Sequence, residues 1–158
     1  MESQEADKKG VVHQLRAWDA KAVAEVIEFR GETTIVVPRE LLPQAAAFLA
    51  SKPSLHFCFL SDISTVDRFP LEPRFEVNYQ LLSLERNERL RLKVRLGGSD
   101  PVVHSVTSVW PTANWHEREN FDLMGIRFEG HPDLSRILMP DDWEGHPQRK
   151  DYPVEGFR

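Results

Sequence analysis

The sequence predicts an α+β fold in two layers, with helices packed on a mostly antiparallel sheet, followed by an extended C-terminal arm. Two segments, 23–37 and 75–96, have the alternation and turn residues of β-hairpins. Between them, residues 39–51 repeat apolar side chains at helical spacing. After residue 128 the chain is interrupted by proline and glycine and shows no such periodicity.

Length and composition fit a single domain with a tail. The 158 residues include 41% hydrophobic and 28% charged side chains and carry a net charge of -5, which is ordinary for a soluble globular protein. We expect a flexible N-terminus over residues 1–10, an α+β domain over 11–128 and a proline-rich docking arm over 129–158, called the arm below. The negative charge gives no reason to expect a nucleic-acid partner.

The sequence contains neither a membrane span nor a cluster of cysteines. The longest apolar run, Ala45–Ala50, is far shorter than the ~20 residues that cross a bilayer, and the polar N-terminus lacks the apolar core of a signal peptide. We therefore expect a cytoplasmic start and membrane contact only through partners. Cys58 is the only cysteine, whereas an iron–sulfur cluster typically needs four thiolates. We expect no cofactor in this chain and place Cys58 in the core.

The N-terminal elements follow from local composition. A short helix is expected from about Val12 to Trp18. The β-branched residues of segments 23–29 and 33–37, with Gly31 between them, predict a hairpin. Pro38 ends its second strand because proline has no amide hydrogen to donate.

The segment from Arg39 to Ser51 is predicted to be an amphipathic helix. Its apolar side chains recur every three or four residues, and Pro43 is tolerated because it falls in the first turn. The aromatic, apolar run Leu55–Leu60 then predicts a buried strand that continues toward Val66.

The second hairpin gives a prediction about register. Apolar residues alternate with polar ones along Phe75–Leu81 and again along Leu90–Leu96. Because successive side chains point to opposite faces, both apolar faces reach the same side only if the connecting loop has an even number of residues. Loops over 86–87 or 86–89 satisfy this condition.

A further helix is expected around residues 115–124. Asn114 lies three residues before Glu117, which is the spacing of a capping box, and Gly125 is the natural residue to follow the last turn. Beyond Gly125 regular structure is not expected, because Pro132, Pro140 and further prolines interrupt the chain. The arm nevertheless contains large apolar side chains, so it should dock either on its own domain or on a partner.

Three groups of polar residues could carry chemistry. A metal site could be assembled from side chains with imidazole and carboxylate ligands, namely His131, Asp133, Asp141, Asp142 and His146. A pair of carboxylates for acid–base chemistry could come from Glu117, Glu119 and Asp122, with Arg118 as an i,i+4 neighbour of Asp122.

We favour contact roles for both groups, because histidine–proline pairs in extended backbone do not fix two ligands on one face, and because aromatic residues lie among the charges. The third group is a basic stripe formed by Arg91, Lys93 and Arg95, with Arg86 and Arg89 near the turn. A solvated or protein-contacting sheet face explains this stripe better than nucleic-acid binding. No dinucleotide, P-loop or nucleophile-elbow motif is present.

The charged segment and the arm resemble the signature of the C subunit of respiratory complex I, the proton-pumping NADH:quinone oxidoreductase. The motifs are E-R-E-x-x-D-L-M at 117–124, G-I-x-F-x-G-H-P-D-L at 125–134 and R-I-L-M-P-D-D-W-E-G-H-P-x-R-K-D-Y-P at 136–153. Three earlier stretches also resemble the family, F-R-G-E-T-T at 29–34, L-S-D-I-S-T-V-D at 60–67 and R-F-E-V-N-Y at 74–79. Ser135 and Gln148 depart from the usual pattern.

The resemblance implies a non-catalytic scaffold and assembly subunit in the peripheral arm of that enzyme. It implies FMN and iron–sulfur clusters in partner subunits, contact with the D subunit of the quinone site and with cluster-bearing subunits, and a place on the cytoplasmic side of a bacterial inner membrane. The residues that it implies for the partner interface are Glu117, Arg118, Glu119, Asp122, His131, Arg136, Asp142, Trp143, His146, Arg149, Lys150, Asp151 and Tyr152.

Two alternatives remain at this point. One is the equivalent subunit of a related membrane-bound hydrogenase or of a quinone oxidoreductase with another electron donor. The other is a stand-alone metal-dependent enzyme that uses His131 and His146.

Overall fold

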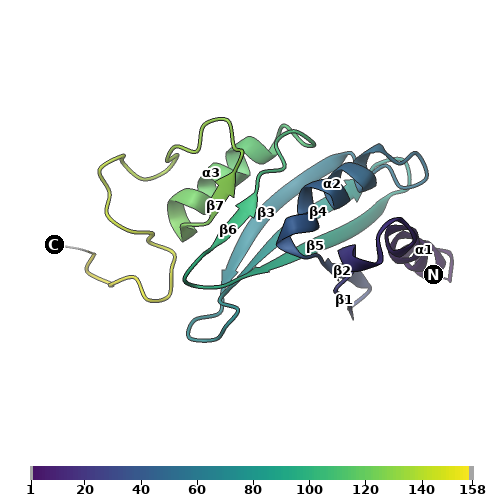
Figure 1. The fold of residues 1–158 in the computed structure, drawn as a ribbon, viewed down its shortest axis with the longest axis horizontal. Coiled ribbons are helices and arrows are strands. Elements are labelled where there is room, and N and C mark those ends of the chain that lie inside the picture. The colour runs from purple at the N-terminus through teal and green to yellow at the C-terminus, as the bar shows by residue number, and fades with distance from the viewer. Residues whose placement is uncertain (1, 157–158) are drawn as a thin grey trace.

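The chain forms a five-stranded sheet with helices packed against one face, as the computed structural model shows (Figure 1). The structure describes the backbone of residues 2–156 and the side chains of residues 10–156. The strand order is β1-β2-β5-β4-β3. Every neighbouring pair is antiparallel except β2 and β5, which are parallel. The predicted two-layer α+β class is confirmed, although the sheet is mixed.

The first hairpin forms as predicted. Strand β1 (Glu25–Phe29) pairs with β2 (Glu32–Val36), and the turn places both Arg30 and Gly31 at positive φ. Because glycine reaches positive φ without a steric penalty, Gly31 suits this turn. The chain leaves β2 through Pro38, as expected.

The N-terminal helix is longer than the sequence suggested. Helix α1 spans Glu2–Trp18, so the predicted start near Val12 is wrong. Val11 and Leu15 on this helix are buried in the core, which is the tertiary contact that stabilises it. A single turn of 3-10 helix, η1 (Ala20–Ala22), follows and is capped by the side chain of Asp19. The expected flexibility of residues 1–10 stays a prediction.

The second helix occupies the predicted segment. It begins with one 3-10 turn, η2 (Arg39–Leu41), and continues as α2 (Leu42–Ser51), with Pro43 in the first turn of α2. Its core-facing side chains are all buried, namely Leu42, Ala45, Ala46 and Leu49. Within residues 2–156, no helix has the length and the apolar character that crossing a membrane requires.

Strand β3 begins later than predicted. It spans Phe59–Asp67, whereas the sequence suggested a start at Leu55. The preceding segment leaves the sheet but still buries Leu55 and Phe57, and the Phe57 carbonyl accepts a hydrogen bond from Trp110 Nε1 at 3.0 Å. Cys58 is exposed, so its predicted place in the core is wrong.

The long hairpin confirms the parity argument. Strand β4 (Phe75–Ser83) pairs with β5 (Glu88–Leu96), and Ser83 faces Glu88. The loop therefore has four residues, 84–87, an even number that begins two positions earlier than predicted. As a result, one face of both strands is buried, through Phe75, Val77, Tyr79, Leu81, Leu90, Leu92, Val94 and Leu96.

Helix α3 (Ala113–Met124) links two short parallel strands, β6 (Val102–His104) and β7 (Arg127–Glu129). The predicted capping box is wrong, because Thr112 is the N-cap residue and Asn114 already lies in the first turn. Glu117 bonds the amide of Val106 instead. Gly125 does follow the last turn, with a left-handed φ of 70°, as predicted.

Helix α3 covers the free edge of β3. Asn120 Nδ2 donates to the Ile63 carbonyl at 2.7 Å, and Asn120 Oδ1 accepts from Thr65 Oγ1 at 2.7 Å. An uncovered edge strand leaves backbone groups open to pairing with other chains. Asn120 therefore satisfies the sheet edge and fixes the helix against it.

We predict that Asn120→Ala lowers the free energy of unfolding by about 1–3 kcal/mol, because it leaves the Ile63 carbonyl unsatisfied. Asn114→Ala is the matched control and should change stability by less than about 0.5 kcal/mol, since Asn114 is not the cap. Urea denaturation measures both. A larger loss at Asn114 than at Asn120 would contradict this account of α3.

Candidate docking surface on helix α3 and the arm

The arm lies back on its own domain although it has no regular structure of its own. Among the described residues, no helix or strand follows β7, and the chain runs as an irregular segment beyond α3 (Figure 1). Backbone amides in such a segment need partners other than a ladder or a helical turn. Three groups of contacts hold the arm on the domain, and the amides of residues 137–139 and 150 find acceptors among them.

Asp122 is the centre of the first group. Its Oδ2 accepts hydrogen bonds from three consecutive amides, those of Ile137 at 3.1 Å, Leu138 at 2.7 Å and Met139 at 2.9 Å. Its Oδ1 accepts from Arg136 Nη1 at 2.6 Å. Burial by itself raises the pKa of Asp122, but these donors outweigh it and hold the pKa below its usual range.

Two arginines complete this contact with the arm. Arg136 Nη2 also donates to the carbonyls of Trp143 at 2.9 Å and Gly145 at 3.1 Å. Arg118 donates to the carbonyls of Ser135 and Arg136, so the Arg118–Asp122 pair expected along the helix is replaced by contacts to the arm. The planar guanidinium group suits such multiple, fixed hydrogen bonds.

The second group closes the C-terminal end of α3. The last carbonyls of a helix have no partner inside the helix. His146 Nδ1 donates to the Asp122 carbonyl at 2.9 Å, while Arg149 Nε donates to the Met124 carbonyl at 2.6 Å. Both side chains approach Gly125 so closely that a Cβ there would collide with them. Gly125 is therefore required for arm packing as well as for its positive φ.

The third group joins the arm to the sheet. The Arg74 guanidinium is bidentate to Asp67, at 2.8 and 2.9 Å, and also bonds Asp151 of the arm at 2.6 and 2.9 Å. The amide of Lys150 donates to Asp67 Oδ2 at 2.9 Å. The Arg74 hydrogen bonds hold the pKa of Asp67 and of Asp151 below the usual range.

Glu117 occupies a separate buried site. Its Oε1 accepts from the Val106 amide at 2.7 Å, whereas Oε2 has no hydrogen-bond partner and lies 4.0 Å from His131 Nε2. The side chains of Glu117 and His131 are both fully buried. Burial raises the pKa of Glu117 to about 7, against weaker opposing contributions from hydrogen bonds with Ser105 and Val106.

His131 connects this buried site to the beginning of the arm. Its Nδ1 accepts from the Asp133 amide at 3.0 Å, so Nε2 carries the hydrogen and donates to the Asn114 carbonyl at 3.2 Å. Tyr79, also fully buried, faces the same region, and its hydroxyl has no hydrogen-bond partner. Burial, and secondarily the Glu117 charge, raise the pKa of Tyr79.

Three large apolar side chains of α3 and the arm remain exposed. Trp115 and Leu138 are each 62% exposed and Trp143 is 39% exposed. Arg118 lies over the Trp115 ring at 5.2 Å from its centroid. We call Trp115, Leu138 and Trp143 the aromatic surface, because two of its three members are tryptophans.

The structure divides the predicted interface residues into two sets. Glu117 and Asp122 are fully buried, so in this conformation their side chains serve contacts within the chain. Side chains that bond the domain or the arm itself are Arg118, His131, Arg136, His146, Arg149, Asp151 and Tyr152, whose hydroxyl donates to the Glu144 carbonyl. Residues that stay exposed are Glu119, Asp142, Trp143 and Lys150.

Sequence reasoning missed Asp67 and Arg74 as partners of the arm. Both lie in stretches that carried the family resemblance, 60–67 and 74–79, which was the available signal. The two departures from the family pattern affect little here. Ser135 accepts through its carbonyl and Gln148 donates through its amide, to Leu123, so either contact is made by the backbone.

The metal-site alternative gains no support from the geometry. Across the described part of the chain, no three histidine, cysteine, aspartate or glutamate side chains are grouped so that they could hold a metal ion. His131 and His146 instead bond backbone atoms of α3.

Fold and surface together define a small α+β domain whose arm is bonded to it and whose exposed tryptophans are of the kind found in protein–protein contacts. The pattern of the family described as "Respiratory-chain NADH dehydrogenase, 30 Kd subunit" matches residues 35–158. The chain belongs to this family, which confirms the resemblance to the C subunit of complex I.

Individual relatives agree with this assignment. The chain is 48% identical over 148 residues to the C subunit of the NADH-quinone oxidoreductase of Roseiflexus sp. (strain RS-1), a match that covers 94% of this chain and 85% of the relative.

Solved structures share the fold. The trypsin-resistant fragment (1-134) of Nqo5 superposes with a TM-score of 0.67 at 34% identity, over 80% of this chain and 98% of that fragment. A chain of the membrane-bound sulfane sulfur reductase, an archaeal respiratory membrane complex, has a TM-score of 0.77 at 24% identity, over 92% of this chain and 85% of that chain.

The raised pKa of Glu117 predicts a pH-dependent stability. The folded state keeps the proton between pH 4.5 and about 7, where the unfolded state releases it, so the free energy of unfolding falls as pH rises through that window. The total loss is on the order of 3 kcal/mol, at 1.36 kcal/mol per pKa unit.

Glu117→Gln, which imitates the neutral acid, should remove this contribution and be more stable than the unchanged chain at pH 8. Urea denaturation at pH 5 and pH 8 measures the difference. Parallel pH profiles for the two proteins would show that Glu117 is ionised in the folded state throughout.

Asp122→Asn should release the arm, because the carboxamide replaces one accepting oxygen with a donor that faces other donors. We expect trypsin to cleave after Arg136 at least about tenfold faster, a change that about 1.4 kcal/mol produces, while circular dichroism shows a folded domain. Asp142→Asn, which changes an exposed carboxylate of the arm, is the control. Equal cleavage rates in the two variants would contradict the role of Asp122.

Proposed function

We propose that the chain is a non-catalytic scaffold and assembly subunit in the peripheral arm of proton-pumping NADH:quinone oxidoreductase. That enzyme passes electrons from NADH through flavin and iron–sulfur centres to quinone. The observation that carries the proposal is the aromatic surface, which Trp115 of α3 forms with Leu138 and Trp143 of an arm that is bonded to its own domain. Family membership and the name of the Roseiflexus relative support the enzyme assignment.

The exposed tryptophans support a contact role. Tryptophan and arginine are enriched where protein interfaces carry most of their binding energy, and Trp115 is exposed together with Arg118 stacked on its ring. Burying such exposed side chains against another protein would be favourable, because apolar surface would be removed from water.

The contacts of the arm define its role in assembly. Asp122, Arg74 and Arg149 use hydrogen bonds to give the arm one conformation on the domain. A segment that is ordered before binding loses less conformational entropy when a partner binds. The arm therefore presents Leu138 and Trp143 in fixed positions instead of ordering them during assembly.

The redox cofactors belong to the partners in this proposal. FMN and iron–sulfur clusters are carried by other subunits, and the contacts are made with the D subunit of the quinone site and with cluster-bearing subunits. The single cysteine supports this division, because Cys58 alone cannot supply the set of thiolates that a cluster typically needs. The proposed location is the cytoplasmic side of a bacterial inner membrane, reached through these partners.

We predict that Trp115→Ala lowers incorporation of the chain into the enzyme complex by about tenfold or more, because truncating a tryptophan at the centre of an interface can cost about 2 kcal/mol or more. The melting temperature of the isolated chain should change by only a few degrees, since Trp115 is 62% exposed. Affinity purification of tagged chain from membranes, followed by NADH:quinone activity, measures incorporation.

Phe29→Ala is the matched control. Phe29 is 64% exposed and carries Arg30 over its ring at 5.2 Å, the same distance as Arg118 over Trp115, but it lies on strand β1. Normal assembly of the Trp115 variant, or an equal defect in the Phe29 variant, would sink the proposal. Deleting residues 131–158 is a less clean test, because Asp67, Arg74 and Asp122 would lose their partners.

A further inference from the structure

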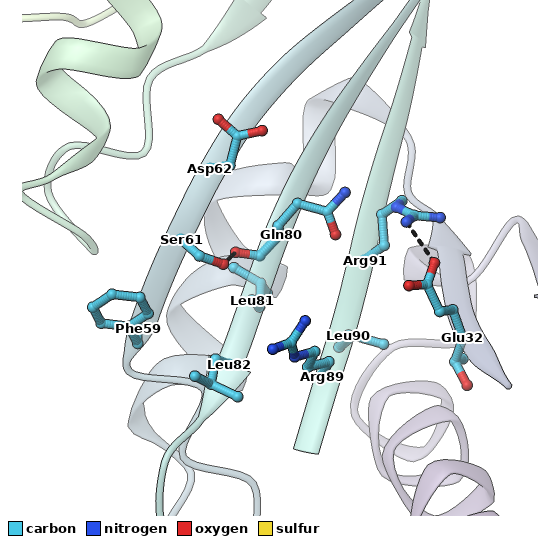
Figure 2. Close-up of a pocket in the computed structure, with 11 residues that line it drawn as sticks. Glu32, Phe59, Ser61, Asp62, Gln80, Leu81, Leu82, Arg89, Leu90 and Arg91 are labelled. Carbon is cyan, nitrogen blue, oxygen red and sulfur yellow. Dashed lines mark hydrogen bonds and ion pairs between the residues drawn. The ribbon is translucent and has the colours of Figure 1, made fainter. Parts of the chain in front are cut away.

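A groove lies on the face of the sheet that the helices leave uncovered, at the end of β3 opposite to Asp67. Its volume is about 510 Å³. The arm bonds the sheet where Asp67 faces Phe75, whereas the groove lies where Phe59 faces Leu82. Its lining includes Phe59, Ser61, Asp62, Gln80, Leu82 and Arg89 (Figure 2).

Basic side chains on this sheet face differ in whether a carboxylate is bonded to them. Arg91 bonds Glu32 at 2.7 Å, Lys93 bonds Glu76 at 2.7 Å, and Arg95 bonds Glu25 at 2.7 Å. Arg89 continues the same row and lines the groove (Figure 2), yet within residues 10–156 its side chain makes no hydrogen bond or ion pair. The basic stripe is therefore neutralised along its length except at Arg89.

Carboxylates near Arg89 are already bonded to other cations. Glu85, in the loop between β4 and β5, faces His56 at 3.0 Å, and Glu88, the first residue of β5, bonds Arg86 at 2.9 Å. Asp62 lines the opposite end of the groove and faces His116 at 3.7 Å. Arg89 thus has a free guanidinium group that can bind a carboxylate in bidentate geometry.

Apolar side chains surround this free cation. Phe59 is 44% exposed on β3, and Leu82 beside it is half-buried. Leu84, in the loop that follows β4, is 62% exposed. Gln80 adds an amide on the floor of the groove, and the hydroxyl of Ser61 is bonded to the Gln80 carbonyl. The groove therefore combines apolar contact area with one unpaired positive charge.

We propose that this groove is a second docking site, which binds a polypeptide segment of another subunit that carries a carboxylate next to an apolar side chain. The carboxylate bonds Arg89, and the apolar side chain packs on Phe59 and Leu82. This inference rests on the proposed function, since it takes the occupant from the same complex. A fully solvated sheet face explains the paired row Arg91–Arg95, but it leaves the apolar rim at Arg89 without a role.

The first test measures protection of the groove in the assembled complex. Ser61→Cys is placed in a Cys58→Ser background, and its rate of reaction with a maleimide is compared between the isolated chain and the purified complex. We expect at least a tenfold slower reaction in the complex. Equal rates in an intact complex would overturn the groove proposal and leave the scaffold proposal standing. Failure of the unchanged chain to assemble would instead overturn the scaffold proposal.

The second test identifies the occupant. A short bifunctional cross-linker attached to the same Ser61→Cys position should capture a peptide of another subunit that contains an aspartate or glutamate beside an apolar residue. Capture of a peptide without a carboxylate, of lipid or of nucleic acid would overturn the proposal.

The charge itself is tested by competition. Arg89→Glu, expressed together with the unchanged chain, should be incorporated at least threefold less often, and Arg89→Lys should be close to normal. Arg127→Glu is the control, because Arg127 is 62% exposed on β7 and does not line the groove. Equal incorporation of the Arg89→Glu and Arg127→Glu variants would contradict the proposal that Arg89 binds the docked segment.

Discussion

The structure of the C-terminal quarter depends on one buried carboxylate. Asp122 accepts three consecutive arm amides and the Arg136 guanidinium, while its own carbonyl accepts from His146. An irregular segment can lie on a protein only if its backbone donors are satisfied. A single acid at the end of α3 meets that need for residues 137–139 and, through the Arg136 side chain, reaches as far as Gly145.

The two faces of the domain differ because apolar side chains are removed from water on only one of them. The sheet buries its apolar side against α1 and α2, and α3 closes the β3 edge through Asn120. On the outer face of the sheet, Arg91, Lys93 and Arg95 are paired with carboxylates, whereas Arg89 in the groove is not. The aromatic surface and the groove suit a protein held between neighbours, which is the role that we propose.

Local patterns predicted those features that depend on neighbouring residues along the chain. The alternation in β4 and β5 required an even loop, and the loop is even. Gly125 was predicted to end α3, and it does. The errors arose where contacts with the rest of the fold are decisive. Helix α3 begins earlier than predicted, so Asn114 is not its N-cap, and Glu117 accepts from the Val106 amide. Cys58 is exposed because strand β3 begins only at Phe59.

By itself, the sequence determined the α+β class, the two hairpins, the irregular character of the arm and the family, because periodicity, proline content and motifs are local properties. It left open whether the arm docks on its own domain or on a partner. Only the tertiary structure decided this, since the partners of Lys150, Asp151 and Arg149 lie respectively on β3, on the β3–β4 connection and at the end of α3, far away in sequence. Hydrogen bonds of that kind follow from folding geometry, which no local pattern encodes.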